Sequence, residues 1–271
     1  MNQDSDANTQ TAASLHSNLN RVRIVLVRTQ LARNIGSAAR AIKNMGLSQL
    51  WLVAPMQFPN PEANALAAGA DDILSSANVV NTLSEALVGC VAVYGTSAHR
   101  RTIELPGLAP ETAAAAAIKL SAESNKEVAL VFGCERVGLE NHELLLCQAR
   151  VEIPANPEFS SLNLSQAVQI CSYELRRAGL AWHSTPSGSG IASLQTRRAV
   201  PASADEFEYF FEHYTRMLAK IDFFASKAPV KVLTRLRRLF QRAEPDSREL
   251  QILRGILTET EKRLRPDVSR H

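Results

Sequence analysis

The chain has 271 residues, of which 45% are hydrophobic, and it carries a formal net charge of +3 and four cysteines. That length suffices for one domain of ordinary size and a smaller one. No apolar run reaches the roughly 20 residues of a membrane-spanning helix, and no Cys or His spacing matches a zinc site. We therefore expect no membrane span, no metal, and free thiols in a reducing cytoplasm.

The charge is distributed unevenly along the chain. Residues 1–181 contain 14 Lys and Arg against 16 Asp and Glu, a net charge of −2. Residues 182–271 contain 16 Lys and Arg against 11 Asp and Glu, a net charge of +5. The C-terminal part is therefore the part that suits an anionic partner.

The first residues differ in composition from the rest of the chain. Residues 1–20 are rich in Ser, Thr, Asn and Gln and lack the apolar stretch of a secretory signal, so we expect a disordered tail. From residue 21 onward, short apolar segments alternate with helix-like ones. Strands are expected at 23–28, 49–54, 90–95, 127–133 and 149–154, and helices at 35–45, 83–88, 110–121, 140–147 and 166–178. This alternation predicts an α/β fold with a mostly parallel sheet over residues 21–181.

A Ser, Gly and Pro-rich stretch over residues 182–204 is expected to be a linker. Three helix-like segments follow it, at 205–224, 229–243 and 246–264. Apolar residues recur every three or four positions in the first and third segments, and a small helical extension over residues 205–271 would bury them. These are Phe207, Phe211, Tyr214, Leu218, Ile221, Leu250, Leu253 and Leu257.

Three segments rich in Gly, Ser or Asn each follow an expected strand. Residues 34–46 read Asn-Ile-Gly-Ser-Ala-Ala-Arg-Ala-Ile-Lys-Asn-Met-Gly, and residues 132–139 read Phe-Gly-Cys-Glu-Arg-Val-Gly-Leu. Residues 153–168 read Ile-Pro-Ala-Asn-Pro-Glu-Phe-Ser-Ser-Leu-Asn-Leu-Ser-Gln-Ala-Val, where Ser165 is expected to be the N-cap of a helix that starts at Gln166. Each segment taken alone fits an ordinary connection between a strand and a helix.

Together, and in this order, the three segments resemble the three motifs of the SPOUT class of RNA methyltransferases, in its ribose 2′-O-methyltransferase branch. The resemblance covers residues 21–181, and the helical extension makes the chain most similar to the TrmJ-type tRNA methyltransferases. It implies a parallel-sheet SPOUT fold with a C-terminal trefoil knot at the third motif, which the pattern of elements does not itself reveal. It also implies a homodimer that methylates tRNA with S-adenosylmethionine, at the anticodon-loop pyrimidine of position 32.

Arg40 is the candidate catalytic residue of the first motif. On the expected helix Arg33, Ser37, Arg40 and Asn44 share one polar face, a spacing that also fits a solvated helix surface. With the resemblance, we expect the Arg40 guanidinium to grip an RNA phosphate by two parallel hydrogen bonds and only secondarily to accept the 2′-hydroxyl proton. A substrate phosphate oxygen is the alternative acceptor. Asn34 is expected to be a helix N-cap or a contact to the nucleotide.

The other two motifs supply further candidates. Glu135 would orient the loop or the substrate, or else be a plain surface carboxylate. Asn163 and Ser161 would contact the cofactor or the ribose, although turn chemistry also explains Ser161. The resemblance implies a cofactor pocket in which Ile153 and Leu162 sandwich the adenine and the absent side chain of Gly133 lets the backbone approach the ligand. Its implied lining is Thr96, Ser97, Ala98, Gly133, Ile153, Ser160, Ser161, Leu162, Asn163 and Leu164.

The second helix of the extension carries a basic stripe, defined as Lys231, Arg235, Arg238 and Arg242. The stripe has one sign of charge over about three turns, and the opposite side carries Leu236, Leu239 and Phe240. Such a stripe is either solvated charge or a surface for a phosphate backbone, and we expect RNA. Arg237 sits apart from the stripe.

Three alternatives stay open from the sequence. A ribosomal RNA 2′-O-methyltransferase would share the core and differ in its target. A non-catalytic RNA-binding protein could retain the SPOUT fold without the reaction. A small-molecule α/β enzyme would act without RNA and would show little dependence of binding on salt.

Overall fold

The computed structural model describes residues 15–97, 103, 105–184, 199–224 and 228–264. The chain divides into two compact units, Met1–Thr196 and Arg197–His271, and each is described by itself. Within the described residues, no helix is long and apolar enough to cross a membrane.

The first unit is built around a seven-stranded sheet in which every paired neighbour is parallel. The order is β3-β2-β1-β6-β4-β7-β5, so the expected α/β fold with a parallel sheet is confirmed. The two edge strands β3 and β5 were not predicted, because two or three residues leave too short a pattern. The strands are β1 (Val22–Val27), β2 (Gln49–Val53), β3 (Asn78–Val80), β4 (Cys90–Thr96), β5 (Gly107–Leu108), β6 (Glu127–Phe132) and β7 (Ala149–Val151).

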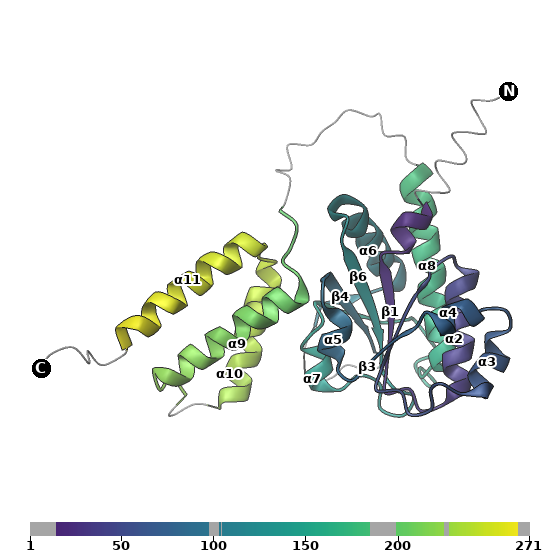
Figure 1. Cartoon of the computed structure of the whole chain (residues 1–271), viewed down its shortest axis with the longest axis horizontal. Helices are drawn as coiled ribbons and strands as arrows, with labels where there is room; N and C mark the ends of the chain where they lie inside the picture. Colours follow the sequence, from purple (N-terminus) through teal and green to yellow (C-terminus); the bar gives the residue numbers. More distant parts are fainter. Residues whose placement is uncertain (1–14, 98–102, 104, 185–198, 225–227, 265–271) are drawn as a thin grey trace, which may run out of the picture. The chain divides into compact units, whose positions relative to one another are not determined.

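Helices cover the sheet as connections between parallel strands (Figure 1). Helix α8 packs against both α2 and α6, and α3 and α4 pack against α2. Gly36 permits this packing, because a Cβ atom there would lie 2.1 Å from the carbonyl oxygen of Ala63 in α3. The helices are α2 (Ala32–Asn44), α3 (Pro61–Ala67), α4 (Asp71–Ser75), α5 (Leu83–Leu87), α6 (Pro110–Ser124), α7 (Asn141–Leu144) and α8 (Leu164–Ser184).

The structure corrects the two ends expected for this domain. Residues 15–19 are helical and Leu19 is buried in the main core, so the tail expected over residues 1–20 is too long. Helix α8 runs to Ser184, past the expected start of the linker at residue 182. The extent of both helices was underestimated from the sequence, because packing against the core, and not the local pattern alone, decides where a helix ends.

The second unit consists of α9 (Ala204–Lys220), α10 (Pro229–Ala243) and α11 (Ser247–Leu264). Its buried residues include most of those expected from the stripes. One expectation is wrong: Ile221 lies just past the end of α9 and is 42% exposed. Leu239 of α10 is 51% exposed. The core uses Leu233, Leu236 and Phe240 of α10 instead, because they share the face opposite the basic stripe.

Candidate active site

The three motif segments meet at the carboxyl edge of the sheet. The strands β1, β6, β4 and β7 are neighbours in that order, and the segments after β1, β6 and β7 contain the three motifs. Crevices at the carboxyl ends of parallel strands are where open α/β sheets bind ligands. The sheet order thus brings together residues that are more than 100 positions apart in the sequence.

A cavity of about 340 Å³ lies between the second and third motif segments and the end of β4, and no residue of the first motif lines it. Of the expected lining residues, the structure places eight around it: Thr96, Ser97, Gly133, Ile153, Ser160, Ser161, Leu162 and Leu164. Asn163 is not part of the lining, and Ala98 lies outside the described residues. Sequence reasoning missed Phe132, Cys134, Arg136, Val137, Gly138, Val151 and Ala167, all of which lie beside or within the motifs.

Gly133 is required by its own loop. A Cβ atom at this position would lie 2.1 Å from the carbonyl carbon of Gly138 and 2.2 Å from the Leu139 nitrogen. The loop folds back on itself there, with a hydrogen bond of 2.9 Å from the Gly138 N–H to the Cys134 carbonyl oxygen. The absent side chain therefore makes room for the returning backbone, and Gly133 also lines the cavity, as expected.

Glu135 holds the N-terminal end of helix α2. Its carboxylate accepts hydrogen bonds from the backbone N–H groups of Gln30 at 2.9 Å and Leu31 at 3.2 Å, and from the Asn34 side chain at 2.7 Å. Partial burial opposes ionisation of this carboxyl, but the donated hydrogen bonds outweigh burial and lower the pKa of Glu135. A carboxylate at this position also faces the positive end of the helix dipole.

Asn34 and Asn163 extend this contact to the third motif. The Asn163 side-chain amide donates to the Asn34 side-chain oxygen at 3.1 Å, so Asn163, Asn34 and Glu135 form one chain of hydrogen bonds. Asn34 lies inside α2, whose N-cap is Leu31, so the N-cap interpretation of Asn34 is wrong.

The prediction that Ser165 is the N-cap of helix α8 is also wrong. Helix α8 begins at Leu164, before Ser165. Asn163 takes the capping role instead, because its side-chain oxygen accepts hydrogen bonds from the Ser165 N–H at 2.9 Å and the Ser165 hydroxyl at 2.7 Å.

Arg40 lies on the exposed face of α2, six residues beyond Asn34. It forms no hydrogen bond or ion pair with another described residue, and it is not among the residues that line the cavity. Its guanidinium is therefore free to bind an external anion. The chain brings Asn34, Glu135 and Asn163 together but leaves Arg40 outside that group.

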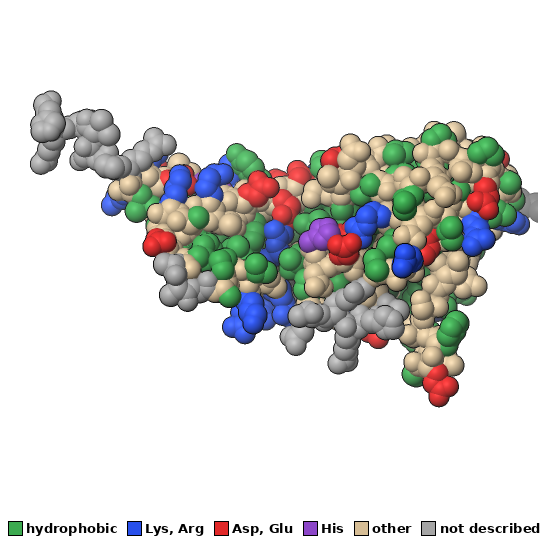
Figure 2. All heavy atoms as spheres, turned by 90° about the horizontal axis from the view of Figure 1, so that it is seen from below, with side chains coloured by type: hydrophobic (Ala, Val, Ile, Leu, Met, Phe, Trp, Pro, Cys, Tyr) green, Lys and Arg blue, Asp and Glu red, His purple; other side chains and the backbone are tan. Residues whose placement is uncertain are grey.

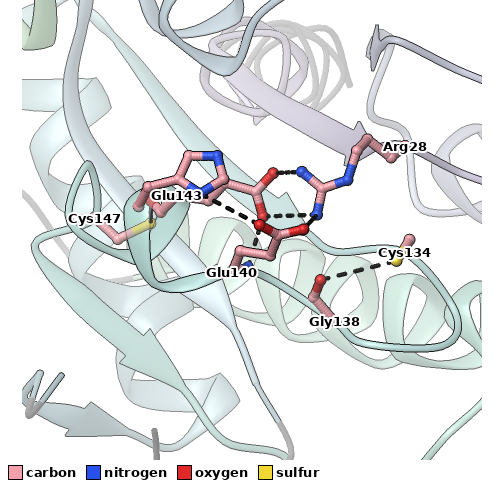
Figure 3. A network of polar contacts seen from close by, with 7 residues as sticks. Arg28, Cys134, Gly138, Glu140, Glu143 and Cys147 are labelled. Atoms are coloured by element: carbon pink, nitrogen blue, oxygen red, sulfur yellow. Dashed lines mark hydrogen bonds and ion pairs between the residues drawn. The ribbon is translucent and has the colours of Figure 1, made fainter. Parts of the chain in front are cut away.

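A second ionic network supports the loop that follows β6 (Figure 3). The guanidinium of Arg28, directly after β1, pairs with Glu143 and, at 3.0 Å, with Glu140. Burial opposes the charge on Arg28, but the two carboxylates outweigh it and raise the pKa of Arg28. Glu143 is buried and also accepts the Glu140 backbone N–H at 2.7 Å, which fixes α7 against the end of β1.

The basic stripe of α10 is a surface feature of the second unit. Lys231, Arg235 and Arg242 are exposed and Arg238 is half-buried. Figure 2 shows Lys and Arg side chains on the surface of this unit beside hydrophobic ones. Arg237, which stands apart from the stripe as expected, turns inward, pairs with Glu208 and lies 4.3 Å from the ring centre of Phe211.

Two family descriptions match separate parts of the chain. Residues 21–173 match the SpoU rRNA Methylase family, and residues 205–269 match the C-terminal domain of the tRNA methyltransferase TrmJ. The two matches correspond to the sheet unit and the helical unit.

Individual relatives match nearly the whole chain. It is 49% identical to the tRNA (cytidine/uridine/adenosine-2′-O-)-methyltransferase TrmJ of Pseudomonas aeruginosa, over 90% of this chain and 95% of that protein. It is 48% identical to the tRNA (cytidine/uridine-2′-O-)-methyltransferase TrmJ of Salmonella typhimurium, over 90% and 98%. The crystal structure of TrmJ from Z. mobilis superposes with a TM-score of 0.75 at 37% identity, covering 88% of this chain and 98% of that one.

Proposed function

Because this chain belongs to the SpoU methylase family, and within it to the TrmJ-type tRNA methyltransferases, we propose that it transfers a methyl group from S-adenosylmethionine to a ribose 2′-hydroxyl of tRNA. The observation that carries the proposal is a cavity lined by the second and third motif segments, to which the first segment is joined by hydrogen bonds. The hydrogen-bond chain of Asn163, Asn34 and Glu135 ties them together there.

The cavity fits the cofactor in size and in lining. Its volume of about 340 Å³ lies within the usual range of small-molecule sites. Ile153 and Leu162 supply apolar surface for an adenine ring, and the loop backbone after β6 and β7 supplies N–H and C=O groups for its edge. Thr96 and Ser97 supply hydroxyl groups, although the Thr96 hydroxyl already donates to the Val131 carbonyl oxygen at 3.1 Å. When bound, the cofactor supplies an electrophilic methyl group on its sulfonium.

The chain's own residues position the nucleophile. The free guanidinium of Arg40 binds a phosphate next to the target ribose, which fixes the 2′-oxygen for in-line attack. A guanidinium group already carries its proton in neutral water and is a poor proton acceptor, so a substrate phosphate oxygen is the alternative acceptor of the 2′-hydroxyl proton. Glu135 and Asn34 act one step away, by holding the helix that carries Arg40.

A homodimer completes this arrangement. Arg40 does not line the cavity of its own chain, so a site that combines the two draws Arg40 from the partner copy. The exposed side chains of Tyr173 and Leu180 on α8 offer apolar surface for such an interface. The trefoil knot belongs to the same proposal, and the match to the SpoU methylase family supports it.

The tRNA is held in part by the second unit. The basic stripe of Lys231, Arg235, Arg238 and Arg242 contacts phosphates, which gives affinity without sequence information. The target is the anticodon-loop pyrimidine at position 32, and the place of action is the cytoplasm, where such a substrate occurs.

The decisive experiment is transfer of labelled methyl from S-adenosylmethionine to total tRNA, followed by nucleoside analysis. A 2′-O-methylated cytidine or uridine is the expected product. Incorporation of label into ribosomal RNA alone would support the methyl-transfer reaction but contradict tRNA as its substrate. Cofactor binding without incorporation into either RNA would leave a non-catalytic RNA-binding protein.

A further inference from the structure

Phe159 is the most exposed large hydrophobic side chain among the described residues, with 80% of its surface accessible. It lies in the segment between β7 and α8. Burial of a phenylalanine ring normally stabilises the fold, and an exposed ring does not contribute this stabilisation. The ring is instead available for contact with a partner.

The backbone around Phe159 is fixed by a tight turn. The Phe159 N–H donates to the Asn156 carbonyl oxygen at 2.9 Å, and the Glu158 N–H donates to the Asn156 side-chain oxygen at 3.1 Å. Pro157 occupies the second position of the turn, where proline is favoured because its φ is already set. The ring is therefore presented by a pre-formed loop.

The turn leads into the lining of the cavity, and Phe159 itself is not among the lining residues. Ser160 and Ser161, the next two residues after Phe159, both line it. Arg136, from the loop after β6, lines the same cavity, is exposed, and has no hydrogen-bond or ion-pair partner among the described residues. An exposed aromatic ring next in sequence to the lining of a cavity, and a free guanidinium within that lining, are the two groups that hold a single-stranded nucleotide, by stacking on its base and pairing with its phosphate.

We propose that Phe159 stacks on a base of the substrate RNA at the mouth of the methyl-transfer cavity, with Arg136 bound to an adjoining phosphate. This inference rests on the proposed function and adds a substrate-binding residue to it. Stacking on an aromatic face tolerates any base, so Phe159 would contribute affinity for an unpaired loop nucleotide without choosing its identity.

The test compares Phe159→Leu, which keeps an apolar side chain and removes the π-face, with Phe159→Trp, which restores it. We expect Phe159→Leu to raise both the Kd and the KM for an unmodified tRNA transcript about 10-fold, and Phe159→Trp to stay near the wild type. Arg136→Gln should weaken tRNA binding and reduce the dependence of its Kd on salt concentration. Affinity for S-adenosylmethionine and the oligomeric state should be those of the wild type in both Phe159 variants.

Trp182→Leu is the matched control, because it removes an exposed aromatic ring near the other end of α8, about 27 Å from Leu164. Unchanged tRNA affinity in Phe159→Leu would overturn the inference, as would a loss that tracks with dissociation of the oligomer or with weaker cofactor binding. A wild-type protein that binds but does not methylate tRNA would overturn the proposed function. Weaker RNA binding by Phe159→Leu would still support the stacking role in that case.

Discussion

The Asn34 side-chain amide donates a hydrogen bond of 2.7 Å to the Glu135 carboxylate, across 101 positions of sequence. This contact fastens helix α2, after β1, to the loop after β6. Since Arg40 is part of the same helix, the position of the proposed catalytic guanidinium depends on a carboxylate in another motif. Glu135 is thus a positioning residue in the proposed mechanism.

Replacing Glu135 with Gln should lower kcat about 10- to 100-fold and the free energy of unfolding by about 1–2 kcal/mol. The glutamine side chain has nearly the same volume but lacks the charged carboxylate, which accepts three hydrogen bonds at the start of α2. Steady-state kinetics and urea unfolding measure the two effects. Glu62→Gln is the matched control, since Glu62 is exposed in the first turn of α3. Equal kinetics in both variants would contradict the positioning role.

The stability contributed by Glu135 should vanish in acid. Its pKa is lowered in the folded protein, so the contribution is fully present above the unfolded value of about 4.3 and is lost as the pH falls through the folded value. The difference in unfolding free energy between the wild type and Glu135→Gln should therefore shrink below about pH 4.3. Urea titrations of both proteins between pH 6 and pH 3.5 measure it. A difference that stays constant or grows on acidification would rule this linkage out.

Arg40→Ala should abolish methyl transfer and leave the affinity for S-adenosylmethionine near that of the wild type, because Arg40 is not among the cavity-lining residues. Arg40→Lys should retain only part of the activity, since an ammonium cannot form the two parallel hydrogen bonds of a guanidinium. Cofactor titration and methyl-transfer assays separate binding from turnover. Lys43→Ala, which removes a charge from the last turn of the same helix, serves as the control. Near-normal turnover of Arg40→Ala would remove this residue from the mechanism.

Replacing Arg235, Arg238 and Arg242 together with Ala should weaken tRNA binding and flatten the slope of log Kd against log salt concentration by about 2. The three side chains belong to one stripe of α10 that faces away from the core of the second unit. A control triple, Lys119, Lys126 and Arg177 to Ala, removes the same charge from the sheet unit. If both triples change the slope equally, net charge and not the stripe governs binding.

Arg237→Ala should destabilise the second unit by about 2 kcal/mol, because it leaves Glu208 without its ion pair and uncovers Phe211. Its effect differs from that of the basic stripe, since Arg237 faces inward. Denaturant unfolding followed by circular dichroism gives the loss, and tRNA binding in the absence of denaturant should keep the wild-type salt slope. A flattened slope without a loss of stability would assign Arg237 to the RNA surface instead.

Most of the longer helices and strands, and the motifs that follow them, could be predicted from the sequence alone. Apolar runs such as those of β1 and β6 are strands buried on both faces, and this pattern predicts a parallel sheet without any knowledge of contacts. The three motif segments were recognised from residue type and spacing, and the stripe of α10 from its period, because both are local properties of the chain.

The contacts between those parts could not be predicted, because they depend on the three-dimensional arrangement of the chain. From the sequence, Asn34 is expected to be an N-cap or a contact to the nucleotide. In the structure it links Glu135 and Asn163, which lie 101 and 129 residues away from it in the sequence. Gly133 is expected from the sequence to leave space for a ligand, and the structure shows that it also makes room for Gly138. Local periodicity fixes which face of an element is apolar, but the order of strands in the sheet fixes which distant side chains become neighbours. The exposure of Phe159 beside the cavity is likewise set by that order and by the turn at Asn156.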